Sequence, residues 1–281
     1  MIKINKDINN IPESLKPATN DFFLIDSIPP DNINTHSKRM LVIENKAYDS
    51  KYNDRYKIDE IKKALNNIYH HKCAFCEQRV EQIQVEHYRP KKKRNNLGHS
   101  YYWLAFSWDN LLVACPTCNT NKSTHFEIEG RRASFINNAK SIRNINSFST
   151  SYNNKEKPLI VNPEVTDPKG FLIFSENGKV SSIDKRFKHT IENVCKLDRS
   201  DLNDQRRKII DDLKNDIRSE LLEKDDVQEQ AKALEILIRS YKRRAENIDE
   251  VFLAFRQYSI DNHWMNNCIK DITHRDFHNF V

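Results

Sequence analysis

Two pairs of cysteines constrain this chain more than any other feature of its sequence. Cys73 and Cys76 form one CxxC pair, Cys115 and Cys118 form a second, and 38 residues separate Cys76 from Cys115. Four thiolates in this pattern are typical of a tetrahedral Zn²⁺ site with Zn–S distances of about 2.3 Å. A site of four cysteines leaves the zinc no position for water. We therefore expect zinc to fold this region, and we expect any chemistry to come from residues between the pairs. The alternative is four buried cysteines without a metal.

The composition indicates a globular protein. Hydrophobic residues make up 38% of the 281 residues, which is enough for a core. No stretch approaches the ~18 consecutive apolar residues of a membrane span, and the first residues lack the apolar run of a secretory signal. We therefore expect a cytoplasmic protein that contacts no membrane. A reducing compartment favours metal ligation over disulfides, and the lone Cys195 and Cys268 are predicted to be buried small hydrophobic residues.

Local patterns divide the chain into four expected parts. Residues 58–71 carry apolar positions at helical spacing, whereas residues 133–157 are rich in Asn and Ser and indicate a surface loop. The stretch PLIVNPE is predicted to be a strand, and Asn177-Gly178 predicts a hairpin with a type I′ turn. Apolar residues recurring along the last third predict three or four packed helices. The expected parts are an irregular N-terminal segment (1–57), the cysteine-containing domain (58–135), a loop and β-hairpin region (136–185), and a helical region (186–281).

Polar motifs lie between and beside the cysteine pairs in a particular order. Val85-Glu86-His87-Tyr88-Arg89-Pro90 follows the first pair, Asp109-Asn110-Leu111 precedes the second, and Asn119 and Lys122 come directly after it. This order resembles the zinc-knuckle branch of the HNH endonucleases. The resemblance implies an α+β fold with a ββα-metal core and a four-cysteine zinc site, here within a largely helical protein, and makes residues 58–135 the nuclease domain. It also implies one catalytic divalent metal and a bracing role for Asn110.

The residue types also suit phosphodiester hydrolysis, which needs a base for water and a cation on the phosphate. A neutral imidazole is available at physiological pH, so His87 is the expected general base. Glu86 and Asn119 offer hard oxygen atoms, which suit Mg²⁺ or Mn²⁺. Neighbouring side chains on a strand point to opposite faces, and we therefore expect a distorted strand end at Glu86 and His87 before Pro90.

Basic residues flank this motif and are expected to contact a nucleic-acid backbone without reading its sequence. The alternative for these residues is an ordinary solvated surface. The expected contacts are Arg89, Lys91, Lys92, Lys93, Arg94 and Lys122.

Longer phrases resemble a narrower group. VEHYRPKKK, LIVNPEVTDPKGFLIFSENGKV and TIENVCKLDRSDLNDQRRKII are similar to the PtuB-like HNH nucleases of Septu and retron-associated anti-phage systems. This resemblance implies a PtuA-like ATPase as partner and, in some systems, a retron reverse transcriptase with its RNA–DNA hybrid. Two alternatives stay open: a stand-alone restriction or repair nuclease, and a zinc-dependent nucleic-acid-binding module without catalysis. The sequence does not separate DNA from RNA as the substrate.

Overall fold

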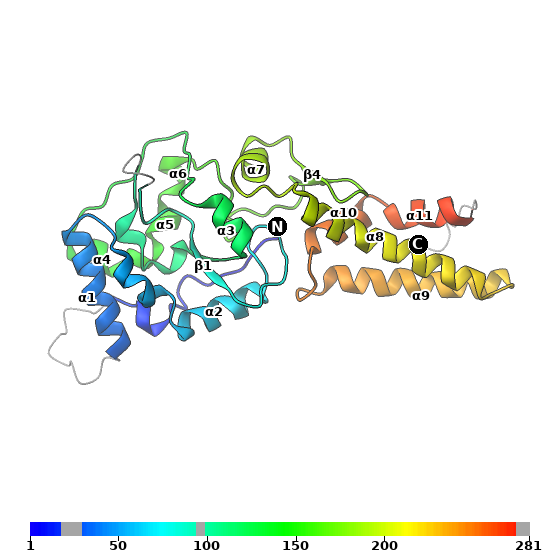
Figure 1. Cartoon of the computed structure of the whole chain (residues 1–281), viewed down its shortest axis with the longest axis horizontal. Coiled ribbons are helices and arrows are strands. Elements are labelled where there is room, and N and C mark those ends of the chain that lie inside the picture. The colour runs from blue at the N-terminus through cyan, green and yellow to red at the C-terminus, as the bar shows by residue number, and fades with distance from the viewer. Residues whose placement is uncertain (18–29, 94–98, 274–281) are drawn as a thin grey trace.

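The computed structural model describes residues 1–17, 30–93 and 99–273, and combines many helices with two small sheets (Figure 1). A compact part holds the cysteine region, and two long helices lie side by side and extend away from it. In chain order, the helical and strand elements before residue 125 are η1 (Glu13–Leu15), α1 (Pro30–Glu44), η3 (Ser50–Tyr56), α2 (Asp59–Tyr69), β1 (Gln84–His87), η4 (Tyr102–Leu104), η5 (Trp108–Asn110), β2 (Leu111–Ala114) and α3 (Pro116–Lys122).

The polar motif lies on a unit of two strands and one helix. β1 pairs with β2 in antiparallel register, with Gln84 opposite Ala114 and His87 opposite Leu111. β2 is buried along its whole length, and α3 follows it directly. Pro116 occupies the first turn of α3, where its missing N–H costs nothing. The predicted helix that leads into the first cysteine pair is confirmed as α2, with Ile61 and Leu65 buried.

The N-terminal segment 1–57 is more regular than predicted. α1 spans 15 residues, so the expectation of irregular structure is wrong there. Its buried Thr35 and Arg39 anchor the helix, and the Arg39 guanidinium donates to the carbonyls of Leu15 and Phe106 at 2.7 and 3.1 Å. Prolines and a weak hydrophobic pattern concealed this helix from the sequence.

Residues 133–157 are not the surface loop that their composition indicates. They form the short helices α4 (Ala139–Arg143), η6 (Ile145–Ser147), α5 (Phe148–Ser151) and α6 (Asn153–Glu156). Ser149 and Glu156 are fully buried against the motif unit. Polar residues here fill a polar interior, which is why a prediction based on hydropathy fails.

The predicted hairpin is confirmed as β3 (Ile173–Phe174) paired with β4 (Val180–Ser181), but its turn differs. Gly178 has φ +84°, whereas Asn177 is not among the residues with positive φ, so the turn is not type I′. A bond from Gly178 N to the Ser175 carbonyl closes a turn with glycine in the left-handed position. The predicted strand PLIVNPE is wrong: residues 158–164 make only an isolated bridge, between Pro158 and Ile128.

The last third is helical, as predicted. It contains α7 (Lys185–His189), the π-helical turn η7 (Thr190–Val194), α8 (Ser200–Leu222), α9 (Val227–Glu246), α10 (Leu253–Asp261) and α11 (Trp264–Thr273). α8 packs against α9 and α11 through a face that includes Ile210, Leu213 and Ile217. Cys195 and Cys268 are buried, as predicted. Among the described residues, no helix combines the length and apolar character that a bilayer crossing requires.

Candidate metal and catalytic site

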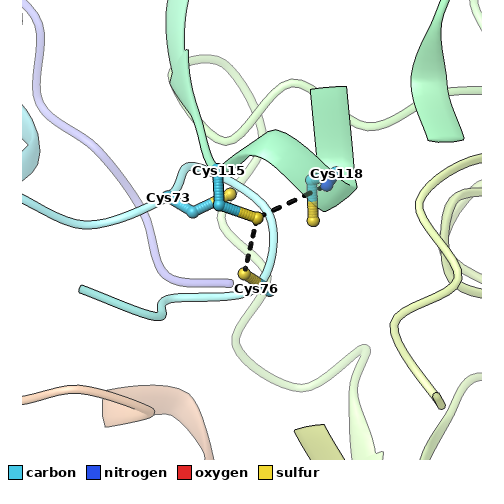
Figure 2. A group of neighbouring side chains, drawn as sticks. All are labelled: Cys73, Cys76, Cys115 and Cys118. Carbon is cyan, nitrogen blue, oxygen red and sulfur yellow. Dashed lines mark hydrogen bonds between the residues drawn. The ribbon is translucent and has the colours of Figure 1, made fainter. Parts of the chain in front are cut away.

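The four paired cysteines come together in one buried cluster (Figure 2). Their sulfur atoms all lie within 4.8 Å of one another, and Cys76 Sγ is 3.7 Å from Cys115 Sγ. A tetrahedron with Zn–S distances of about 2.3 Å has sulfur–sulfur edges of roughly 3.8 Å. The cluster therefore has the size and donor set to hold a metal ion such as zinc.

Backbone bonds and one arginine tie this cluster to its surroundings. Ala74 N donates to the Val113 carbonyl at 2.9 Å, which fixes the first cysteine pair against β2. Cys115 caps α3 and accepts from Cys118 N at 3.4 Å. Arg199 Nη1 lies 3.8 Å from Cys118 Sγ. Arg199 connects the cluster to α8, and because four thiolates around Zn²⁺ carry excess negative charge, its guanidinium would stabilise a zinc-bound cluster electrostatically.

One face of β1 meets one face of α3 through two polar pairs. Asn119 Nδ2 donates to Gln84 Oε1. Lys122 Nζ donates to Glu86 Oε1 at 2.6 Å and to the His87 carbonyl at 2.7 Å. Gln84 and Glu86 are two residues apart on a strand and therefore share a face, whereas Asn119 and Lys122 are three apart on a helix and lie on one side. Glu86 and Asn119, the expected metal ligands, thus belong to the same interface.

The remaining oxygen atoms of this pair are hard donors, the kind that divalent cations such as Mg²⁺ take. Among the described residues, neither Glu86 Oε2 nor Asn119 Oδ1 has a hydrogen-bond partner, so both stay available as ligands. In the described ranges, only the four cysteines form a group of three or more His, Cys, Asp or Glu ligands. Mg²⁺ usually keeps several waters and takes one or two protein oxygens, so a two-ligand site suits it. The Lys122 ammonium on Glu86 is the group with which such a cation would compete.

His87 is buried, with both ring nitrogens engaged. Nε2 lies 2.9 Å from the Ala105 carbonyl, which can only accept, so Nε2 carries the proton. In the neutral ring, Nδ1 therefore holds the lone pair, and Lys91 Nζ lies 3.2 Å from it. Burial, with help from the Lys91 charge, lowers the pKa of His87 well below 6.5. The ring is thus neutral at physiological pH and presents a basic nitrogen toward Lys91.

The expected distortion at the end of β1 is not observed. The pairing with β2 is regular through His87, so Glu86 and His87 follow the normal alternation of side chains. They nevertheless share neighbours. The Tyr56 ring packs edge-on against His87 with 4.6 Å between ring centres, and burial followed by the Glu86 charge raises the pKa of Tyr56 to about 12. Lys91 likewise contacts His87 Nδ1 and is influenced by the Glu86 charge.

Asn110 is fully buried and holds the segment that follows His87. Its Oδ1 accepts from Arg89 N at 2.8 Å, and its Nδ2 donates to the Arg89 carbonyl at 3.0 Å. Its own carbonyl accepts from Tyr88 N at 2.9 Å. These bonds fix the backbone on the C-terminal side of His87, and Ser149 Oγ adds a 3.0 Å bond to the same Oδ1.

Arg89 and Lys122, two of the predicted nucleic-acid contacts, are buried and do not lie on the surface as expected. Arg89 has no exposed surface: its Nε pairs with Glu156 Oε2 at 2.8 Å, and Ser149 and Asn153 accept from its other nitrogens. Lys122 is equally buried and pairs with Glu86. Both cations bind protein oxygens, because a buried charge must be paired to be tolerated, and they are not accessible to a polyanion.

The other basic positions keep some access. Lys91 and Lys92 are half-buried and Lys93 is exposed. Arg94 lies outside the described residues. Of the predicted contacts within the described residues, those that keep access are therefore the lysines just after β1.

Sequence reasoning missed several residues that surround the motif. Gln84 could have been found, because it precedes Glu86 by two positions and must share its face. Tyr56, Glu156 and Arg199 are distant in sequence and carry no motif. Only the folded chain brings them to His87, Arg89 and Cys118, respectively.

Comparisons with known proteins point to one group. The chain is 31% identical to the Septu protein PtuB of Bacillus mycoides (strain KBAB4) over 172 residues, which covers 57% of this chain and 54% of that protein. It is 38% identical to the Septu protein PtuB of Bacillus thuringiensis over 69 residues, or 23% of this chain and 24% of that protein. It is also 26% identical to the Septu protein PtuA of Bacillus mycoides over 163 residues, covering 55% of this chain and 21% of that protein.

These matches span about half or less of the length of each curated relative. No protein-family profile matches the chain, and no solved structure matches it either. The chain is therefore related in part to Septu proteins.

Proposed function

We propose that this protein is a metal-dependent HNH endonuclease that hydrolyses phosphodiester bonds in nucleic acid. The observation that supports the proposal is that β1 and α3, the elements that continue from the four-cysteine cluster, carry Glu86, His87 and Asn119, with Glu86 and Asn119 at one face of β1 and His87 at its end. The three side chains supply a neutral base and two uncommitted oxygens within one ββα unit, which are the parts that hydrolysis requires.

Each residue has a distinct role in this mechanism. His87 Nδ1 removes a proton from the attacking water, while the bond from Nε2 to the Ala105 carbonyl holds the tautomer and the ring orientation. Asn110 holds the backbone after His87 and does not transfer protons. Glu86 and Asn119 would hold Mg²⁺ or Mn²⁺, which when bound neutralises charge that develops on the phosphate. The four cysteines would hold zinc and keep α3 in position against β1.

The role that we propose in the cell is defence against phage. The support is the similarity to proteins named Septu PtuB and Septu PtuA. We propose a PtuA-like ATPase as the partner that controls cleavage, and a retron reverse transcriptase with its hybrid as a further partner. Control by a second protein would restrain a nuclease able to damage its own cell.

The decisive experiment compares wild type with His87→Ala. Each purified protein is incubated, alone and with a PtuA-like ATPase, with DNA and with total RNA in Mg²⁺ or Mn²⁺. We expect His87→Ala to cleave about 10²- to 10⁴-fold more slowly, which is the usual contribution of a general base. His99→Ala is the matched control, because that histidine is exposed and should leave the rate unchanged. Equal rates for wild type and His87→Ala would refute the assignment, and the polymer that only active protein degrades names the substrate.

Two observations favour a second candidate, a nucleic-acid-binding module without catalysis. His87 is only 3% exposed, and one Glu86 oxygen is bonded to Lys122. Both features would have to change before water and a divalent cation could enter. A wild-type protein that binds nucleic acid but cleaves neither polymer, with or without the ATPase, would support this candidate.

A further inference from the structure

Three lysine ammonium groups gather on two tyrosine rings beside His87. The ring centres of Tyr48 and Tyr56 are 6.5 Å apart. Lys91 Nζ lies 4.7 Å from the centre of Tyr56 and 5.4 Å from that of Tyr48. Lys57 Nζ lies 5.7 Å from Tyr56, and Lys92 Nζ lies 5.8 Å from Tyr48. A tyrosine face attracts an ammonium group without neutralising it, so the three positive charges are concentrated at one place.

The carboxylates that act on this lysine cluster each have a cationic partner of their own. Glu86 is the acidic group that acts on Lys91, and it is paired with Lys122. Asp49 acts on Lys92 but forms a 2.9 Å ion pair with Lys51. The cluster of Lys57, Lys91 and Lys92 therefore carries an excess of positive charge.

The pKa of Lys91 reflects this excess. Burial is the main cause that lowers it, and the charges of Lys57, Lys122 and Lys92 lower it further, to about 8, against the opposing effect of Glu86. Keeping Lys91 protonated therefore costs more free energy in the unliganded protein than it does for an exposed lysine. A bound anion would relieve that cost, because it would attract all three lysines at once.

Lys91 also stands in front of the basic nitrogen of His87. The Nζ–Nδ1 distance is 3.2 Å, and the other ring nitrogen faces the Ala105 carbonyl. Water that loses a proton to Nδ1 must approach from the side that Lys91 occupies. A group that attracts the Lys91 ammonium away from His87 therefore leaves Nδ1 free to accept a proton.

We propose, on the basis of the nuclease function proposed above, that Lys57, Lys91 and Lys92 on the rings of Tyr48 and Tyr56 bind the phosphates next to the scissile bond. Binding of the nucleic-acid backbone draws Lys91 from His87 Nδ1 onto a phosphate oxygen. Lys91 is thus a positioning residue that keeps the base covered until substrate arrives. The contacts are to the backbone and are independent of base sequence.

Salt-dependent binding tests this proposal separately from cleavage. Fluorescence anisotropy of a labelled DNA duplex and of a labelled RNA is measured with the full-length protein without added divalent metal, at several salt concentrations. We expect Lys57→Gln and Lys91→Gln each to weaken binding about 3- to 10-fold and to reduce the slope of log K against log salt by about one. Lys91→Arg should retain the slope of wild type. Lys57 is exposed, so its substitution does not threaten the fold.

Lys208→Gln is the matched control, because it removes the same charge from an exposed position on α8. Equal affinity and slope for Lys57→Gln, Lys91→Gln and wild type would overturn the proposal, as would a wild type that binds neither polymer. If Lys57→Gln and Lys91→Gln reduce the salt slope but the wild type cleaves neither polymer, the result would support the phosphate site and count against the nuclease function. Cleavage by the wild type together with unchanged salt slopes in the lysine variants would support the nuclease function and count against the phosphate site.

Discussion

The cysteine-containing unit and the α8–α9 arm are stabilised in different ways. The unit has two four-residue strands and one seven-residue helix, too little apolar surface to fold by burial alone, and it relies on four cysteines and a buried polar network. The arm consists of long amphipathic helices that bury Ile210, Leu213 and Ile217 on one side. The difference teaches that the candidate site residues lie where the structure depends on specific polar bonds, whereas the arm depends on apolar burial along one side of each helix.

Loss of the metal should have the largest effect, and it should destabilise the cysteine-containing unit while leaving the arm intact. Cys115→Ser removes one of four zinc ligands and should abolish tight zinc binding, whose free energy in small zinc domains is about 10–16 kcal/mol. Hydrogen exchange should then show that β1, β2 and α3 lose protection while α8 and α9 keep it. Cys268→Ser, at a buried cysteine outside the cluster, should retain zinc as measured by elemental analysis. Retained protection of β1 in Cys115→Ser would contradict the dependence on metal.

Glu156→Gln tests how much the buried polar network contributes to the stability of the cysteine-containing unit. The substitution leaves the Arg89 guanidinium without a negative partner in the interior, and breaking such a pair costs about 3–5 kcal/mol. Chemical denaturation should show this loss together with weaker protection of the segment after β1. Ile217→Ala is the control in the arm, where a cavity of the usual cost should destabilise α8 and leave zinc content unchanged. An effect of Glu156→Gln below about 1 kcal/mol would argue against a structural role for the pair.

The smallest expected effect is a dependence of stability on pH at Asp109. Burial raises the pKa of Asp109 to about 6, against hydrogen bonds from Thr150 and Ser107 that lower it. The native state therefore binds a proton between about pH 4 and 6 that the unfolded state releases, so this residue's contribution to stability falls as pH rises through that range. Between about pH 4 and 7.5 this contribution changes the free energy of unfolding by up to about 3 kcal/mol, and Asp109→Asn should remove the change. Identical pH profiles of the free energy of unfolding for the two proteins would show that Asp109 is not buried as described.

The sequence by itself determined the elements whose signal is local. CxxC spacing predicted the four-cysteine cluster, four-residue periodicity predicted the helices of the last third, and Asn177-Gly178 predicted the hairpin. Motif order predicted that His87 and Glu86 lie on a strand and Asn119 at the start of the following helix, but not that Glu86 and His87 keep the normal alternation of the strand. These features depend on backbone geometry over a few residues, or on a cysteine spacing that is typical of one shared metal ion.

Tertiary structure alone decided which polar residues are buried and what they contact. Arg89 and Lys122 look like ordinary surface cations in sequence, but Glu156 and Glu86 hold them in the interior. Tyr56 and Lys57, which lie well before His87 in the chain, reach the site only because η3 packs against the end of β1. The physical reason is that the free energy of a buried charge depends on its partner, and the partner's position is a property of the whole fold.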